Sequence, residues 1–239
     1  KKISLIIPAY RLSRRIQHTV KVLKHILGNG NIDYEMIVVD DGSPDDTYKR
    51  ALEIASNNIK VLRYERNRGK GYALIYGFKH CDGDVIIFFD GDLDVHAKQV
   101  RLLLRAIQKS NADVVITSKW HPRSKVLANP IRKFLSKLFN VLVQVLTGIR
   151  LRDTQTGAKA FKRYVLEKVA PLLTIKRYAF DVELLAAINS QGYKIVEVPA
   201  LYQIRLMSRF SFKEIFRMFI DLLAITYRLR VKKQYKRIC

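Results

Sequence analysis

Three carboxylates follow directly on an apolar run in the first half of the chain. The run is Val85–Phe89, and Asp90, Asp92 and Asp94 come after it at every second position. Carboxylates spaced in this way can converge on one hard cation, and a Mg²⁺ or Mn²⁺ ion held by few protein ligands keeps positions open for substrate phosphates. The alternative is a solvated acidic turn in which Asp94 caps the next helix, but three charges in five residues would repel one another. The pattern therefore favours a metal site.

Two other apolar runs end in residues suited to binding a nucleotide. Asp40-Asp-Gly-Ser43 follows Met36–Val39, and one carboxylate there could accept a hydrogen bond from a base N–H or a ribose hydroxyl. Ser43 is also a candidate helix N-cap, so a plain turn stays open as the alternative. Asn67–Gly71 places two glycines and Lys70 before a helix, a favourable place for an anion. It is not a Walker P-loop, because the required spacing and the Lys-Ser/Thr pair are absent.

Short β-rich runs alternate with helical patterns through the first half of the chain, and the alternation weakens after residue 119. We expect strands at residues 3–7, 36–39, 60–64, 85–89, 113–118 and 194–198. We expect helices at residues 13–27, from 44 onward, and at 71–79, 96–109, 131–147, 180–190 and 212–231. Continuous apolar strands that alternate with helices predict an α/β fold, a mostly parallel sheet flanked by helices. Ligands of such sheets bind at the carboxyl ends of the strands.

The charge of the chain is unusually positive and unevenly distributed. Lys and Arg number 44 against 21 Asp and Glu, a net charge of +23. Such a chain should bind polyanions such as nucleic acid, phosphorylated ligands or an anionic membrane. Residues 33–94 hold 13 of the 21 acidic residues, whereas residues 114–152 hold none and eight Lys or Arg. We expect no nucleic acid partner, because the acidic strand ends would repel phosphates and no nucleic-acid-binding motif is present.

The C-terminal segment predicts an amphipathic helix. Residues 212–231 place apolar side chains at helical spacing and are followed by Lys232-Lys233 and Lys236-Arg237. This pattern suits a membrane interface, and the alternative is a helix docked on the protein's own core or in a dimer. Residues 131–147 could lie beside it and guide an apolar chain, or pack in the core; their apolar positions are Phe134, Leu138, Leu142 and Val145. No stretch reaches about 18 uninterrupted apolar residues, so we expect no transmembrane helix, which leaves open a segment beyond Cys239.

In combination and order, these motifs resemble a family 2 glycosyltransferase of the GT-A fold. The residues that carry the resemblance are Pro8-Ala-Tyr10, Asp40-Asp-Gly-Ser43, Gly69-Lys-Gly71 and Asp90-Gly-Asp92. The second half resembles the polyprenyl-phosphate branch, which includes dolichyl-phosphate mannose synthases and β-glucosyltransferases. The residues there are Arg132 with Ser136, Asp153-Thr-Gln-Thr-Gly157 and Phe180-Asp-Val-Glu-Leu184. The last two runs are closer to the glucosyltransferases, and the resemblance spans residues 2–210.

The resemblance implies a role for each matching position. The nucleotide-binding positions are Pro8, Ala9, Tyr10, Asp40, Lys70, Asp90 and Gly91. The metal ligands are Asp92 and Asp94, and the residues that position the acceptor phosphate are Lys119, Arg132 and Ser136. The residues that close on the donor are Arg205, Ser208 and Arg209. Two departures stand out: Arg11 and Leu12 replace the usual Asn-Glu after Tyr10, and the closing segment lacks its usual glycine and has Arg for Lys.

The implied reaction is metal-dependent, inverting transfer of a hexose from a nucleotide sugar to a polyprenyl phosphate. UDP-glucose is the favoured donor and GDP-mannose the next, with Mg²⁺ or Mn²⁺ as cofactor. We expect a catalytic domain over residues 1–210 (nucleotide-sugar half 1–118, acceptor half 119–210) and a membrane-interface tail over residues 211–239. The protein would lie peripherally on the cytoplasmic face of an anionic membrane, with a homo-oligomer or a further membrane partner left open.

Two alternatives remain at this point. A sugar hydroxyl could be the acceptor, as in polysaccharide synthesis, and Asp181 or Glu183 would then be the base. Those two carboxylates could equally be structural and pair with Lys176 or Arg177. His96 is the histidine nearest the acidic cluster, and it is more simply explained as an ordinary helix residue. A basic nucleic-acid-binding domain is the less favoured alternative.

Overall fold

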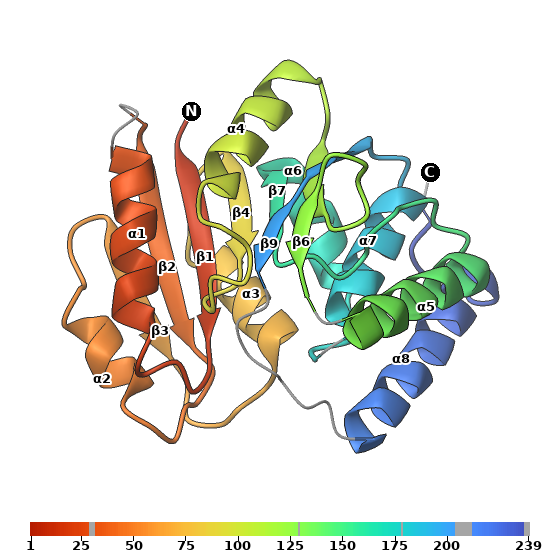
Figure 1. Cartoon of the computed structure of the whole chain (residues 1–239), viewed down its shortest axis with the longest axis horizontal. Coiled ribbons are helices and arrows are strands. Elements are labelled where there is room, and N and C mark those ends of the chain that lie inside the picture. The colour runs from red at the N-terminus through yellow and green to blue at the C-terminus, as the bar shows by residue number, and fades with distance from the viewer. Residues whose placement is uncertain (29–31, 129, 178, 204–211, 237–239) are drawn as a thin grey trace.

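A seven-stranded sheet forms the centre of the computed structural model, which describes residues 1–28, 32–128, 130–177, 179–203 and 212–236 (Figure 1). The strand order is β3-β2-β1-β4-β7-β5-β8, and β6 and β9 form a separate parallel pair. The strands are β1 Ile3–Ala9, β2 Tyr34–Asp40, β3 Ile59–Arg63, β4 Val85–Phe89, β5 Val114–Ser118, β6 Lys125–Leu127, β7 Ala158–Lys162, β8 Ile195–Pro199 and β9 Leu201–Gln203. The predicted mostly parallel α/β sheet is confirmed, with all six expected strands present.

One strand of the main sheet was not expected from the sequence. β7 lies between β4 and β5 and runs antiparallel to both. Its five residues, Ala-Lys-Ala-Phe-Lys, include two lysines and lack the long apolar run that marks the other central strands. Lys159 is nevertheless buried, because a carboxylate from a neighbouring helix pairs with its ammonium group. A tertiary contact that the local sequence does not reveal therefore makes this strand possible.

Helices cover both faces of the sheet, and each face has its own apolar core. α1, α2 and α4 pack on one face, and α3, α6 and α7 pack on the other. The helices are α1 Ile16–Gly28, α2 Thr47–Leu52, α3 Lys70–Phe78, α4 Gln99–Lys109, α5 Pro130–Thr147, α6 Arg163–Val169, α7 Phe180–Ser190 and α8 Phe212–Arg230, with a short 3₁₀ turn at Ala170–Leu172. The expected helices are present, and α6 is an additional one.

α5 and α8 lie side by side outside α7 (Figure 1). Val143 of α5 and Leu222 and Ile225 of α8 point into the core. The opposite sides of both helices are exposed and apolar; their exposed residues are Phe134, Leu135, Leu138, Val141, Val145, Phe216, Phe219, Ile220, Leu223 and Tyr227. Core packing therefore does not explain Phe134, Leu138 and Val145, whereas Leu142 is half-buried against the core. No helix in the described part of the chain is both long and apolar enough to cross a bilayer.

Candidate active site

The sheet brings the three predicted strand ends together. β1 is the neighbour of both β2 and β4, and all three run parallel. Ala9 is paired with Asp40, so Pro8–Tyr10 and the turn after Asp40 leave the sheet side by side. Asp90 follows the last residue of β4 at the same edge. The nucleotide-binding candidates of the first half therefore share one edge, including Gly91, where an added Cβ would lie 2.8 Å from Leu12 and 3.1 Å from the Pro8 carbonyl oxygen.

The two adjacent aspartates after β2 have different surroundings. Asp41 accepts hydrogen bonds from the Tyr64 hydroxyl, the Asn67 amide and the backbone N–H groups of Arg68 and Gly69. It therefore fixes the loop that leads to Lys70. Asp40 is fully buried, and its Oδ1 has no hydrogen-bond partner among the residues that the structure describes. Burial raises the pKa of the Asp40 carboxyl.

A partnerless buried oxygen is unfavourable unless a ligand supplies the missing donor. The other oxygen of Asp40, Oδ2, accepts from the Ser43 N–H and lies 3.4 Å from Nε of Arg63. Oδ1 is therefore the atom to which a base or ribose donor could bind. Tyr10, one residue beyond the paired Ala9, is 40% exposed and could cover such a base.

A chain of alternating charges joins the two halves of the fold. Lys70 Nζ lies 2.7 Å from Asp90 and 3.2 Å from Asp181, and Lys159 Nζ lies 2.9 Å from the other oxygen of Asp181. Lys159 also donates to the carbonyl of Thr156. Lys70 begins α3, Asp181 lies in the first turn of α7, and Lys159 is in β7. α3, α7 and β7, which are far apart in sequence, thus come together beside Asp90.

The ammonium groups keep Asp181 ionised. Burial alone would raise the pKa of Asp181, but Lys159 and Lys70 outweigh it and the net pKa is lowered. Burial would lower the pKa of Lys70, but Asp181 and Asp90 outweigh it and the net pKa is raised. Asp181 is therefore a weak base at neutral pH, and Lys70 is a permanent cation.

The acidic turn after β4 carries the two predicted metal ligands, Asp92 and Asp94. Leu93 adopts a left-handed backbone conformation (φ 60°), and the Asp94 N–H donates to Asp92 Oδ1 at 3.0 Å. Burial, together with the neighbouring charge of Asp94, raises the pKa of Asp92. A divalent cation at this turn would offset both effects.

The donor set fits Mg²⁺ or Mn²⁺ bound jointly with a phosphorylated ligand. Across the residues that the structure describes, no three His, Cys, Asp or Glu side chains form a complete metal-binding group. Mg²⁺ is commonly held by one or two carboxylates and by substrate phosphates rather than by an all-protein cage. Asp92 and Asp94 could hold the ion in that way.

The Asp153–Gly157 loop supports the acidic turn from the second half of the chain. The Gly157 carbonyl accepts from the Asp90 N–H at 2.9 Å, and a Cβ at Gly157 would lie 2.7 Å from an Asp90 carboxylate oxygen. Only glycine leaves this carboxylate in place. Asp153 accepts from the Lys119 backbone N–H and lies 3.6 Å from Lys119 Nζ. The loop therefore links Asp90 to Lys119.

The structure gives only part of the surroundings of the remaining predicted site residues. Ser136 is half-buried on α5, and Arg132 is in the first turns of that helix, with its side chain outside the described part. Arg205, Ser208 and Arg209 lie outside the residues that the structure describes. His96 is exposed and precedes α4, so its interpretation as a helix residue is wrong; it lines a cavity together with Asp94 and Tyr202.

Glu183 is not brought to the site. It is fully buried and bonds to Thr174, Ile175, Tyr235 and Arg228. The expected partners of the two helix carboxylates were also wrong. Asp181 pairs with Lys70 of α3 and Lys159 of β7, and Glu183 pairs with Arg228 of α8.

Two residues of the site were missed at the sequence level. Lys159 stands between two alanines, and a buried lysine requires a charged partner, but this signal in the sequence is weak. Tyr202 in β9 lies beside the acidic turn and 5.3 Å from Lys119 Nζ, measured to its ring centre. Burial and the charges of Asp90, Asp94 and Asp92 raise the pKa of Tyr202, so its hydroxyl stays protonated. No local pattern identifies Tyr202.

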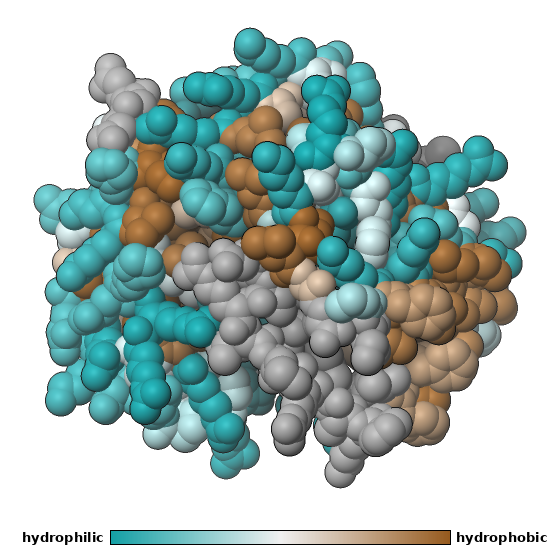
Figure 2. Space-filling model, in the orientation of Figure 1, coloured by the Kyte–Doolittle hydropathy of each residue, from teal (hydrophilic) through white to brown (hydrophobic). Residues whose placement is uncertain are grey.

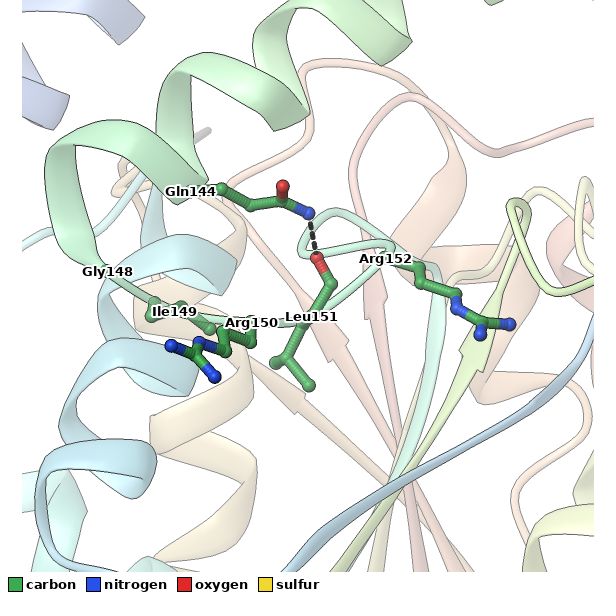
Figure 3. A pocket seen from close by; sticks show the side chains of 6 residues that line it. All are labelled: Gln144, Gly148, Ile149, Arg150, Leu151 and Arg152. Atoms are coloured by element: carbon green, nitrogen blue, oxygen red, sulfur yellow. Dashed lines mark hydrogen bonds between the residues drawn. The ribbon is translucent and has the colours of Figure 1, made fainter.

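A smaller and a larger cavity lie in the described part of the chain, and the smaller one borders this site. One of about 190 Å³ is bounded by Leu93, Asp94 and Tyr202 among others. The other, of about 460 Å³, lies at the end of α5 between Gln144 and Arg152 (Figure 3). There the Gln144 amide donates to the Leu151 carbonyl, and the side chains of Arg150 and Arg152 point away from each other (Figure 3). The larger cavity shares no lining residue with the carboxylate cluster, so we do not place the chemistry in it.

Comparison with known proteins agrees with this geometry. The family model for glycosyl transferase family 2 matches residues 4–170. The dolichyl-phosphate beta-glucosyltransferase ALG5C of Trichomonas vaginalis is 30% identical over 240 residues, which cover 95% of this chain and 71% of that protein. The glycosyltransferase AglD of Haloferax volcanii is 29% identical over 203 residues, 83% of this chain, and the chain spans only 32% of its length.

Solved structures establish the fold. The glucosyl-3-phosphoglycerate synthase of Mycobacterium tuberculosis, in complex with Mn²⁺, UDP and glucosyl-3-phosphoglycerate, superposes with a TM-score of 0.71 at 21% identity. The match covers 95% of this chain and 79% of that one. A second structure of the same synthase contains Mg²⁺ and UDP. The predicted GT-A fold is confirmed.

Proposed function

The chain belongs to glycosyl transferase family 2 and is a glycosyltransferase that takes a hexose from a nucleotide sugar, and on that premise we propose that its acceptor is a polyprenyl phosphate such as dolichyl phosphate. We propose UDP-glucose as the donor, with GDP-mannose next. The names of the Trichomonas relatives support the acceptor and the sugar. The observation in the structure that carries the proposal is the state of Asp181, which lies between two ammonium groups.

A phosphate acceptor requires no general base. Phosphate monoesters have a second pKa of about 6 and are already anionic at neutral pH, so positioning is all they require. A sugar hydroxyl, by contrast, must lose a proton to a base. The lowered pKa of Asp181 and the buried position of Glu183 disfavour both candidate bases. The site therefore supports transfer to phosphate over transfer to a hydroxyl.

We propose that the donor binds across the edge of the first half. The Asp40 Oδ1 atom would accept a hydrogen bond from the base or ribose, next to Pro8, Ala9 and Tyr10. Asp92 and Asp94 would hold Mg²⁺ or Mn²⁺, which supplies positive charge for the leaving diphosphate. Lys70 is held beside Asp90 and adds a fixed cation near the same group.

The acceptor half would position the attacking oxygen. Lys119 is anchored to Asp153 and to the Gln155 carbonyl, and we propose that it grips the lipid phosphate together with Arg132 and Ser136. A phosphate oxygen then forms a bond to the anomeric carbon while that carbon's bond to the diphosphate oxygen breaks. The electron pair leaves with the nucleoside diphosphate. Attack on the opposite face inverts the centre, so an α-linked donor gives a β-linked product. Arg205, Ser208 and Arg209 would close on the donor.

We propose that the exposed apolar sides of α5 and α8 lie in the membrane interface. Figure 2 shows hydrophobic residues gathered over these two helices. Monomeric proteins rarely expose large contiguous apolar patches, and amphipathic helices with cationic ends bind anionic bilayers. We therefore propose that residues 1–210 form the catalytic domain and that residues 211–239 form a segment that contacts the cytoplasmic face of the membrane.

The double variant Leu138→Asp with Phe216→Asp tests the membrane surface. Both side chains are more than half exposed. Each charge should lower affinity for vesicles containing one-third anionic lipid about tenfold, because a buried leucine or phenylalanine contributes roughly 1.5–3 kcal/mol. Flotation of the protein with vesicles measures the effect. Leu52→Asp, an equally simple change at an exposed leucine of α2, should leave flotation unchanged. Equal flotation of wild type and double variant would rule out this surface.

The proposed reaction is tested by a transfer assay. Purified protein receives radiolabelled UDP-glucose or GDP-mannose, a polyprenyl phosphate in detergent, and Mg²⁺ or Mn²⁺. We expect labelled product in the organic phase from UDP-glucose, and none after addition of EDTA. A sugar hydroxyl acceptor replaces the lipid in a parallel reaction. Transfer to that acceptor alone would overturn the polyprenyl phosphate.

A further inference from the structure

A buried carboxylate outside the proposed site joins the C-terminal helix to the start of α3. Glu183 is fully buried in the first turns of α7. One side of it meets the C-terminal segment: the Tyr235 hydroxyl donates to Glu183 at 2.6 Å, and Arg228 lies 3.1 Å away. Arg228 Nε also donates to the Tyr235 hydroxyl at 3.0 Å. The three side chains form a closed network between α7 and α8.

The other side of Glu183 fixes the segment that follows the 3₁₀ turn. Its carboxylate accepts from the N–H groups of Thr174 and Ile175 at 3.0 and 2.7 Å, and from the Thr174 hydroxyl at 2.8 Å. Four hydrogen bonds and one ion pair thus satisfy this group. The positions of residues 174 and 175 depend directly on where Glu183 lies.

The next residue after this segment holds the first turn of α3. The Lys176 carbonyl accepts from the Gly71 N–H at 2.9 Å and from the Tyr72 N–H at 3.4 Å. Gly69 has φ 99°, and a side chain there would collide with the same carbonyl. Lys70 lies between these two contacts, and its ammonium group binds Asp90 and Asp181. A displacement of residues 174–176 must therefore move Lys70.

We propose that Glu183 is a positioning residue that couples the seating of α8 to Lys70, and thereby sets the affinity for the nucleotide diphosphate. The proposal rests on the proposed function only in assuming a nucleotide donor at Lys70. Asp181 and Glu183 lie two residues apart on α7, one bonded to the site and the other to the C-terminal segment. The first turn of α7 therefore connects Lys70 at the site to the C-terminal segment.

Tyr235→Phe tests the coupling with the smallest change. It removes one hydroxyl and keeps a ring that is fully buried in the core. We expect the variant to fold and to bind UDP in the presence of Mn²⁺ about fivefold more weakly, the lower end of usual coupling between sites. In the ligand-free protein, the Gly71 and Tyr72 amides should exchange with solvent several-fold faster. Glu183→Gln should change both readouts in the same direction.

Ser4→Ala is the matched control. The Ser4 hydroxyl also donates to a buried carboxylate, that of Glu35, but at the start of β1, far along the strand from the site. It should lower the thermal stability without changing UDP affinity or exchange at Gly71. If Tyr235→Phe behaves like Ser4→Ala in all three measurements, the network is merely structural and the proposal fails. If wild type binds neither UDP nor GDP, the proposed donor fails, while exchange at Gly71 still decides the coupling.

Discussion

Replacing Asp92 by asparagine should lower kcat/KM for sugar transfer about a thousandfold, because loss of the metal site forfeits several kcal/mol of charge stabilisation. Asparagine keeps the size of the side chain and an oxygen that can still accept the Asp94 N–H. It removes the charge that a divalent cation requires. The measurement is the initial rate of organic-phase product at saturating metal. A second readout is UDP binding, which should depend on Mn²⁺ in wild type and lose that dependence in the variant.

The control for this prediction is Asp46→Asn. Asp46 is exposed before α2, and its side chain makes no capping hydrogen bond to that helix. Its replacement removes the same charge from the chain and should leave the rate within twofold of wild type. The metal assignment would be wrong if Asp92→Asn kept more than a tenth of the activity and its UDP binding still fell on addition of EDTA.

The strands and helices that depend on short stretches of sequence could be predicted. Six strands and the order of helices follow from apolar runs and helical spacing, and the three strand ends meet because neighbouring parallel strands end at one edge. The pairing of Ala9 with Asp40 is an example. The Asp90–Asp94 turn could be found because its carboxylates are close in sequence.

Contacts that depend on distant segments could not be predicted in the same way. Lys159 lies in a strand of five residues whose placement depends on Asp181, 22 positions later. Asp40 and Asp41 look alike in the sequence, and only the loop at Asn67–Gly69 shows that one is bonded and the other has an orphaned oxygen. The helical pattern of α8 likewise predicts an apolar side, but not that Leu222 and Ile225 are buried while Phe216 is exposed.

Lys159→Met should destabilise the fold by about 3–5 kcal/mol, the usual cost of removing one partner from a buried ion pair. Methionine has a similar length and can occupy the same space in β7. The change leaves Asp181 with Lys70 as its only paired cation among the described residues, and frees the Thr156 carbonyl. The midpoint of thermal unfolding should fall by about 10 °C for a chain of this size. Calorimetry or circular dichroism measures it.

Two further variants test whether the loss of stability comes from the unpaired charge of Asp181 or from the loss of the lysine side chain. Lys162→Met, in the same strand, removes a half-exposed lysine 3.5 Å from Asp113 and should cost less than about 1 kcal/mol, as surface pairs do. Adding Asp181→Asn to Lys159→Met should restore part of the lost stability, because the unpaired buried charge is gone. We also expect the double variant to be inactive, since Lys70 would then lack Asp181, one of the two carboxylates that hold it. Equal unfolding of Lys159→Met and Lys162→Met would mean that Asp181 does not depend on Lys159, and that Lys70 alone maintains its charge.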